Sequence, residues 1–467
     1  MNARKFARLG VPQGEAMRLA GTAVREARAF GIAKRDIPDL ITAVVENPTD
    51  YLQDELFDKL AAAILQHERE QPHFKPRKEP APFQIWGDDL DENSVNQMKN
   101  AAQLPVSVRG ALMPDAHLGY GLLIGGVLAV RNAVIPYAVG VDIACRMKLS
   151  VLNLPPHTLR GEQKRLANAI EYETRFGIGA NFRKGERRDH PVMEMDWGVT
   201  AVTQRLRDKA WEQLGTSGSG NHFVEFGILT ILNDQLGLPT GEYLALLSHS
   251  GSRGSGATVA DHYSKLAMEL HPELPKELRH LAWLDLDSDA GREYWAAMQL
   301  MGQYAAANHA CIHQHVVKAL SAKVLLDIEN HHNFAWKEQH DGETAIVHRK
   351  GATPAGEGVL GIIPGSMGAP GFVVRGKGNE AALSSAAHGA GRRMSRKQAI
   401  KSFTWSEVKK FLRERDVTLL SAGLDEVPMA YKDIHEVMAA QADLVEKMAR
   451  FDPKLVKMAS AGERPED

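Results

Sequence analysis

A stretch rich in proline and charge divides this chain into two parts with different hydrophobic patterns. Residues 67–83 read HEREQPHFKPRKEPAPF. Proline restricts the backbone and removes hydrogen-bond donors, so this composition favours an extended linker over a packed element. We therefore predict a boundary near residue 83, between an N-terminal region at 1–83 and a larger domain at 84–467.

Before this linker, apolar residues recur at helical spacing. The segments 14–31 and 52–70 place their apolar side chains three or four residues apart, with charged residues between them. This spacing puts the apolar residues on one face of a helix. We predict helices within residues 12–66, with Asp36 and Asp50 as N-caps or first-turn acids.

After the linker, short apolar runs alternate with glycine-rich turns, which is typical of buried strands. The runs are LLIGGVLAV (122–130), VIPYAVGV (134–141), YLALLSH (243–249), TAIVHR (344–349) and GFVVRG (371–376). Longer segments at 290–320 and 423–450 have helical spacing. The domain is therefore predicted to be mixed α/β, an α+β arrangement with an added N-terminal helical region.

The composition favours a globular protein in a reducing compartment. The hydrophobic fraction is 44% and the charged fraction 24%, and no run approaches the roughly eighteen apolar residues that a membrane span needs. The first residues, MNARKFARLG, lack the apolar core of a secretory signal. Two cysteines, Cys145 and Cys311, cannot form a disulfide framework. The expected location is the cytoplasm.

The charge balance limits how the chain can bind nucleic acid. The formal net charge is −2, which argues against coating nucleic acid by bulk electrostatics. Any contact with RNA would need a local basic patch. The basic loop 183–190, RKGERRDH, is one such stretch, although a solvated loop explains it equally well.

Five glycine-flanked segments place metal-binding or nucleophilic side chains where a strand gives way to a loop. They are VGVDIAC (139–145), GSGNHFVE (218–225), SHSGSRG (248–254), ENHHN (329–333) and AAHGAGRRMSR (386–396). Asp142 and Cys145 are three residues apart, so a carboxylate and a thiolate can face one metal ion from a single turn. The alternative for Cys145 is a buried free cysteine, and Cys311 lies in a helical segment where packing is expected.

The histidines of these segments extend the possible ligand set. His222 and His249 each stand beside turn residues, although a lone histidine there is often a structural group. His331 and His332 point in opposite directions if they lie on a strand, so only one reaches a given metal. One Asp, one Cys and three His suit Mn²⁺ as well as Zn²⁺. A bridging sulfur makes a two-metal site with open positions feasible, as phosphoryl chemistry requires.

Two further segments suit phosphate or nucleotide binding. The loop GIIPGSMGAPGF (361–372) offers free backbone N–H groups that can cradle phosphate or purine oxygens. Small residues surround His388, which lets a bulky substrate approach its imidazole. Histidine can attack phosphorus and form a phosphoramidate. Arg253 and the arginines after His388 suit phosphate oxygens, although a solvated charged face also explains the latter.

The order of these motifs resembles the RtcB family of RNA ligases. The motifs are MPDAHLGYGLLIGG, VGVDIAC, GSGNHFVEF, HSGSRG, HHN, RKGA, IIPGSMG, HGAGR and MSR, and the resemblance runs from about residue 84 to residue 448. It implies joining of RNA ends that carry a 2′,3′-cyclic phosphate or 3′-phosphate to 5′-hydroxyl ends, in tRNA splicing or RNA repair. The family's cofactors are GTP and two Mn²⁺, for which Zn²⁺ or Co²⁺ can substitute.

Carried onto this sequence, the resemblance implies a role for each site residue. Cys145 would bridge two ions, one held also by His249 and His332 and the other by Asp142 and His222. His388 would be guanylated by GTP. Asn221, Glu225, Ser366 and Lys457 would hold the guanylate, and Arg253, Arg392 and Arg396 would hold phosphates. The expected partners are RNA ends and an archease-like activator, and the expected state is a monomer that binds no membrane.

The sequence departs from the family pattern at three points. Arg146 follows Cys145 where glycine is usual, TPAGEG follows Ala352 where many members have an arginine near position 356, and the end reads PKLVKMASAGERPED instead of a valine-rich strand with a terminal lysine. Two other outputs stay open, a 3′-phosphate guanylyl-capping enzyme and an RNA-binding factor. The N-terminal region would be either a stabilising or dimer-forming appendage or an adaptor for RNA or a partner.

Overall fold

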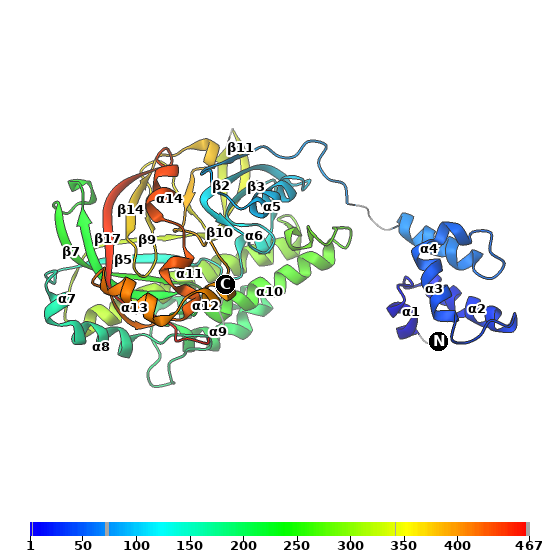
Figure 1. Cartoon of the computed structure of the whole chain (residues 1–467), viewed down its shortest axis with the longest axis horizontal. Helices are drawn as coiled ribbons and strands as arrows, with labels where there is room; N and C mark the ends of the chain where they lie inside the picture. Colours follow the sequence, from blue (N-terminus) through cyan, green and yellow to red (C-terminus); the bar gives the residue numbers. More distant parts are fainter. Residues whose placement is uncertain (2, 71–73, 341, 464–467) are drawn as a thin grey trace. The chain divides into compact units, whose positions relative to one another are not determined.

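The structure, a computed structural model, describes residues 1, 3–70, 74–340 and 342–463 (Figure 1). The chain divides into two compact units, Met1–Phe74 and Lys75–Asp467. The mixed α/β class and the added N-terminal helices are as predicted. Within the described residues, no helix is both long enough and apolar enough to cross a membrane.

The first unit is a small helical bundle with its own core. Its elements are α1 (Ala3–Arg8), α2 (Glu15–Ala29), α3 (Ile37–Glu46), the 3₁₀ helix η1 (Pro48–Tyr51) and α4 (Asp58–Glu70). Alanines of α2 pack against Ile41 and Val44 of α3 and Leu60 of α4, so the helical spacing in the sequence marks the buried faces. Asp36 occupies the N-cap position of α3 but accepts no capping hydrogen bond with its side chain.

The division between the units falls nine residues before the predicted boundary. Residues 75–83 of the predicted linker lie along the second unit: Arg77 N–H donates to Gln103 O at 2.9 Å, and Ala81 N–H donates to Ala102 O at 2.8 Å. The prolines in this stretch have no N–H to donate. The residues between them do, and these attach the extended segment to the domain.

Two large sheets build the second unit. Within the described residues, an eight-stranded sheet has the order β13-β14-β17-β6-β7-β5-β9, with β16 paired to β17, and a five-stranded sheet has the order β1-β2-β3-β11-β10. Small two-stranded sheets join β12 with β15 and β4 with β8. The strands are β1 (Phe83–Ile85), β2 (Ser107–His117), β3 (Ile124–Val130), β4 (Ala133–Val134), β5 (Arg146–Leu152), β6 (Phe223–Ile231), β7 (Gly241–Ser250), β8 (Leu284–Asp285), β9 (Val324–His331), β10 (Asn333–His340), β11 (Glu343–Lys350), β12 (Ala352–Pro354), β13 (Leu360–Ile363), β14 (Gly371–Gly376), β15 (Ser385–Ala387), β16 (Thr418–Ser421) and β17 (Val445–Met458).

Helices cover the eight-stranded sheet (Figure 1). The α-helices are α5 (Glu92–Ala102), α6 (Pro136–Val139), α7 (Thr158–Gly161), α8 (Gln163–Glu173), α9 (Ala201–Gln213), α10 (Arg253–Leu270), α11 (Asp289–Ala319), α12 (Arg396–Ser402), α13 (Trp405–Arg413) and α14 (Ile434–Ala440). Short 3₁₀ helices occur at Pro191–Glu194, Trp197–Val199, Asp234–Leu236, Arg279–Leu281, Glu380–Ala382, Leu424–Glu426 and Pro428–Ala430. Helix α11 contacts β5 and β7, and α8 contacts β6 and β17. Ile312 and Val316 of α11 pack with Leu246 of β7 in one core cluster.

The predicted helix at 290–320 is confirmed as α11, and four of the five predicted strands are confirmed as β3, β7, β11 and β14. The fifth, at 134–141, is wrong. Strand β4 ends at Val134, and α6 begins at Pro136, a residue whose fixed φ suits the first turn of a helix.

The predicted helix at 423–450 is also largely wrong, since α-helix occurs there only in α14 (Ile434–Ala440), after two short 3₁₀ helices. Helix α14 ends at Ala440, and β17 begins at Val445 and runs between β14 and β6. The buried residues Val445, Met448 and Ala449 fit a helical spacing as well as a strand. Pairing on both sides of β17 decides the outcome, because tertiary context overrides a local pattern of this length.

Candidate active site

The possible metal ligands converge because their segments end at neighbouring strands of the eight-stranded sheet. Asp142 and Cys145 lie in the loop before β5, which is flanked by β7 and β9. His249 lies near the end of β7, His332 directly follows β9 and His222 directly precedes β6. Phe223 of β6 pairs with His249 of β7. The sheet order therefore brings together residues that are up to 190 positions apart in sequence.

These five side chains form two overlapping triads that share Cys145, namely Cys145 with His249 and His332, and Cys145 with Asp142 and His222. All five are buried. Cys145 Sγ lies 3.1 Å from His249 Nε2 and 3.4 Å from His222 Nε2, and His249 Nε2 lies 3.2 Å from His332 Nε2. Asp142 Oδ2 lies 3.0 Å from His222 Nε2.

This spacing fits a shared metal site. Ligand atoms bound at about 2.0–2.3 Å, at tetrahedral or octahedral angles, are about 2.8–3.8 Å apart. His249 Nδ1 lies 3.0 Å from Asn221 O, a carbonyl that can only accept, so Nδ1 carries the proton and Nε2 keeps a free lone pair. Burial lowers the pKa of His249 to about 3 and that of His332 well below its usual value, so both rings are neutral at pH 7.

The carboxylate in the cluster is ionised. Burial opposes ionisation of Asp142, but its contacts with His222 and Cys145 hold its pKa below the ordinary value. The backbone nearby is strained: Ala144 has φ 57°, and its N–H donates to Asn333 O at 2.7 Å. A non-glycine residue in this left-handed region costs of order 1–3 kcal/mol and is typical of functional sites.

The adjacent histidines at 331 and 332 face different surroundings. His332 joins the cluster, whereas the His331 ring packs 5.1 Å from the Phe334 ring and 4.9 Å from the Trp336 ring. Such a division is expected of neighbouring residues at a strand end.

His388 is oriented by a buried carboxylate. Its Nδ1 lies 2.7 Å from Asp115 Oδ2, and its own N–H and that of Gly389 donate to the same oxygen at 3.1 and 3.2 Å. Asp115 is fully buried on β2. The carboxylate accepts a hydrogen bond from Nδ1–H, so the free lone pair of the ring lies on Nε2. The His388 ring centroid is 4.9 Å from that of His332.

Two glycines pack closely against His388 and Asp115. A Cβ at Gly351 would lie 3.1 Å from His388 Cε1, and one at Gly391 would lie 2.2 Å from Asp115 O. The residue that sequence reasoning missed is Asp115 itself. It stands inside MPDAHLGYGLLIGG, but nothing in that motif indicates that its partner lies 273 residues further on.

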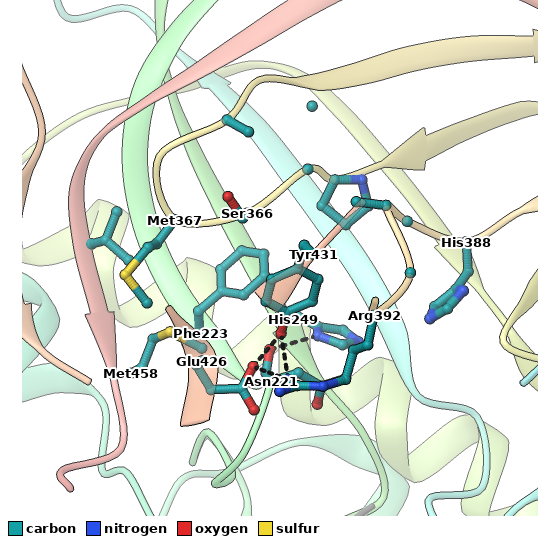
Figure 2. Close-up of a pocket in the computed structure, with 18 of the residues that line it drawn as sticks. Asn221, Phe223, His249, Ser366, Met367, His388, Arg392, Glu426, Tyr431 and Met458 are labelled. Atoms are coloured by element: carbon teal, nitrogen blue, oxygen red, sulfur yellow. Dashed lines mark hydrogen bonds and ion pairs between the residues drawn. The ribbon is translucent and has the colours of Figure 1, made fainter. Parts of the chain in front are cut away.

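A narrow cavity of roughly 100 Å³ extends from His388 (Figure 2). His388 lies at one end, and Met367 and Met458 lie at the other. Asn221, Glu225 and Ser366 also line this cavity. Burial raises the pKa of Glu225 well above its ordinary value, and among the described residues no cation or hydrogen-bond donor offsets the shift.

Lys457 does not reach this cavity. Val456 and Met458 line it, and strand residues alternate in direction, so Lys457 points to the other face of β17. Its Nζ lies 3.2 Å from Glu171 Oε1 and 5.3 Å from the Phe176 ring centroid. The expected contact of Lys457 with guanine is therefore not supported by the geometry.

A second cavity of about 650 Å³ joins the cluster to His388. Asp142, Cys145, His222, His332 and His388 line it together with the basic residues Lys350, Arg392, Arg393, Arg396 and Lys432. This is the kind of local basic patch that the net charge of −2 requires for binding RNA. Burial lowers the pKa of Lys350 to about 7.

The three arginines expected at phosphates differ in position. Arg392 and Arg396 line both cavities. Arg392 Nη1 lies 3.2 Å from Glu426 Oε2, and Arg396 pairs with Glu426 and Asp425. Arg253 lines neither cavity: it is buried, and its guanidinium donates to Thr216 Oγ1 and Gly177 O, both at 3.1 Å. These contacts tie the start of α10 to the segments that contain Thr216 and Gly177.

Arg146 and the arginines of the basic loop form contacts within the fold. Arg146 is buried, donating to Gly302 O of α11 at 3.1 Å and to Glu329 at 3.3 Å. In the basic loop, Arg187 pairs with Glu212, and Arg188 pairs with Glu173 at 2.9 Å. Cys311 is packed, as predicted, while His309 and His313 of the same helix turn inward to the Ser248 hydroxyl.

The second unit therefore brings together a buried donor set that could hold metal ions and a histidine oriented by a carboxylate. The family described as tRNA-splicing ligase RtcB matches residues 97–458. The RNA-splicing ligase RtcB of Escherichia coli (strain K12) is 36% identical over 397 residues, covering 79% of this chain and 95% of the relative. The tRNA-splicing ligase RtcB of Nanoarchaeum equitans is 32% identical over 460 residues, covering 82% and 96%. The chain belongs to the RtcB family of RNA ligases.

Proposed function

We propose that this chain is a GTP- and Mn²⁺-dependent ligase that joins RNA 2′,3′-cyclic phosphate or 3′-phosphate ends to 5′-hydroxyl ends. The observation that carries the proposal is His388. Asp115 accepts a hydrogen bond from Nδ1 of His388. The His388 side chain lines both the narrow cavity and the 650 Å³ cavity, called here the basic cavity, which contains the ligand cluster. Relatives named RNA-splicing or tRNA-splicing ligases support an RNA substrate.

The narrow cavity would take the guanosine of GTP. The Glu225 carboxylate has two acceptor oxygens, which match the N1–H and 2-amino donors of guanine. Adenine presents no such pair of donors, so this residue would select guanine. Asn221 and Ser366 line the same cavity and supply further polar contacts, with His388 at the end where the α-phosphate would lie.

Two divalent ions would be held by the cluster, one by Asp142, Cys145 and His222 and the other by Cys145, His249 and His332. When bound, they neutralise phosphate charge as it develops in the transition state. Thiolate and imidazole ligands also suit Zn²⁺ and Co²⁺, so these ions are expected to substitute for Mn²⁺.

His388 would act as the nucleophile. Its Nε2 attacks the α-phosphorus of GTP, an N–P bond forms and pyrophosphate leaves. The imidazole becomes cationic in this step, and the Asp115 carboxylate stabilises that charge through the Nδ1 proton. Side chains at Gly351 and Gly391 would crowd the His388 ring and the Asp115 backbone, so these glycines let the pair keep its geometry.

The RNA would react in two further steps. An oxygen of the RNA 3′-phosphate attacks the guanylate phosphorus, the N–P bond breaks and neutral His388 is regenerated. The 5′-hydroxyl then attacks the RNA phosphorus, loses its proton and displaces GMP, leaving a 3′,5′-phosphodiester. A cyclic phosphate is first opened by water. Lys350, Arg393 and Lys432 of the basic cavity would hold the RNA phosphates.

Ligation with defined RNA ends tests this proposal. We expect an RNA with a 3′-phosphate to be joined to a 5′-hydroxyl RNA when GTP and Mn²⁺ are present, and the product to be lost when ATP replaces GTP, because adenine lacks the donors that Glu225 accepts. Gel analysis of end-labelled RNA measures the product. Accumulation of a guanylylated 3′ end without joining would indicate a capping enzyme, and unchanged RNA would indicate a binding factor. The archease-like activator, monomeric state and cytoplasmic location stay predictions.

A further inference from the structure

An outer cavity adjoins the catalytic one. It measures about 600 Å³ and is lined partly by Gln97, Lys276, Arg279 and His280. Gly119 and Tyr120 line both this cavity and the 650 Å³ cavity that contains the metal-ligand cluster and His388. Tyr120 therefore stands where a strand leaving the catalytic cavity would pass.

The backbone around Tyr120 is fixed from several directions. The side-chain amide of Gln97 donates to Gly119 O at 2.6 Å, and Gly119 N–H donates to Gln97 Oε1 at 3.2 Å. The buried ammonium of Lys350 donates to Tyr120 O. Gly121 has φ +71°, and a Cβ there would lie 2.7 Å from His280 O. The loop is thus pre-organised, which lowers the entropy cost of binding a ligand to it.

The Tyr120 ring contrasts with this anchored backbone. It is 74% exposed, and the neighbouring Leu118 is 50% exposed. Its one aromatic contact among the described residues is an edge interaction with His280, at 6.2 Å between ring centroids. An exposed aromatic face beside Lys276 and Arg279 matches the platforms that bind single-stranded nucleic acid, in which rings stack on bases and cations bind phosphates.

We propose that Tyr120 is a stacking platform for an unpaired base of the RNA end, next to the ligation junction. The inference rests on the proposed RNA ligase function and assigns a positioning residue to it. The base would lie on the Tyr120 ring, and Lys276 and Arg279 would contact the phosphates that follow in the outer cavity. Because every base has an aromatic face, this contact would tolerate any sequence at the end.

Binding of a short fluorescent RNA tests the proposal without any chemical step. Fluorescence anisotropy with a 3′-phosphorylated single strand and with a 5′-hydroxyl single strand, in Mn²⁺ but without GTP, gives the Kd of each, and the strand whose base stacks on Tyr120 is the one that should respond. Tyr120→Ala is expected to weaken binding by roughly tenfold, the loss of one stacked base, while Tyr120→Phe keeps the wild-type Kd. Tyr172→Ala is the matched control, since Tyr172 is 68% exposed but lines neither of these cavities.

RNAs with an abasic site identify the stacked base. Removal of the terminal base from a 3′-phosphate strand or from a 5′-hydroxyl strand should abolish the effect of Tyr120→Ala on one of the two strands. Equal Kd values for wild type and Tyr120→Ala on both the 3′-phosphate strand and the 5′-hydroxyl strand would overturn the proposal. Equal losses in Tyr120→Phe and Tyr120→Ala would do so too, since they would indicate a role for the hydroxyl. Labelling of His388 by GTP needs no RNA, so a chain that labels but shows no effect at Tyr120 refutes only this inference.

Discussion

Replacement of Cys145 by alanine is expected to remove both bound metal ions and to lower ligation by roughly a thousandfold or more. The Sγ atom belongs to both triads, so its loss leaves each ion with two of its three protein ligands. The ions would contribute several kcal/mol to transition-state stabilisation, which corresponds to a rate change of this size. Metal content is measured by mass spectrometry after dialysis with Mn²⁺, and ligation on the RNA pair described above.

Cys311→Ala provides the matched control. Cys311 is also buried, but it lies in α11 outside both triads. Burial raises the pKa of its thiol to about 12, so it stays protonated and is a poor ligand. This substitution should cost about 1 kcal/mol of stability and leave the metal content unchanged. Two bound ions in Cys145→Ala would contradict the bridging role of the thiolate.

Glu225→Gln is expected to lower the use of GTP by roughly a hundredfold or more and to stabilise the nucleotide-free protein. Glutamine replaces one acceptor oxygen with an amide donor, which would face a donor of guanine. Two hydrogen bonds to a charged acceptor would be lost or weakened, at about 1.5–3 kcal/mol each. Guanylation kinetics over a range of GTP concentrations measure the first effect.

The stability effect depends on pH in a defined direction. Burial raises the pKa of Glu225 in the folded chain above its unfolded value, so the folded state binds more protons. Stability therefore falls as pH rises from the unfolded pKa, near 4.5, through the raised folded pKa. Glutamine does not titrate, so the gain in melting temperature should be larger at pH 8 than at pH 5.

Glu242→Gln controls for the general effect of removing a carboxylate from the sheet. Glu242 is exposed on β7, so this change should alter neither the pH dependence of stability nor guanylation. An equal gain in melting temperature for Glu225→Gln at pH 5 and pH 8 would contradict the account of a buried, uncompensated carboxylate. Unchanged GTP use by that variant would remove Glu225 from guanine recognition.

The ligand cluster could be anticipated from sequence because each ligand lies in a short glycine-flanked segment at a strand end. The sequence could not decide between His331 and His332, since that choice depends on which side of β9 faces the loop before β5. Asp115 was missed because its contact with His388 links β2 to the segment after β15. Long-range pairings of this kind are set by the tertiary fold and leave no local pattern.

Strand register explains why Lys457 does not line the narrow cavity. Lys457 stands one residue from two that line the narrow cavity, and a shift of one position on a strand reverses the direction of a side chain. Helical spacing at Val445, Met448 and Ala449 concealed β17, so that alternation could not be read from the sequence. Arg253 carries the charge that phosphate binding needs, but backbone and hydroxyl acceptors inside the fold occupy its guanidinium.

Covalent labelling by GTP tests the central claim most directly. The chain and its His388→Ala variant are incubated with α-labelled GTP and Mn²⁺, and the protein is separated under denaturing conditions. We predict a labelled, acid-labile band in the wild type that is absent from the variant, because the Nδ1 hydrogen bond to Asp115 leaves Nε2 of His388 as the proposed nucleophile. No band in the wild type with metal bound, or an equal band in His388→Ala, would contradict the proposed nucleophile and the mechanism built on it.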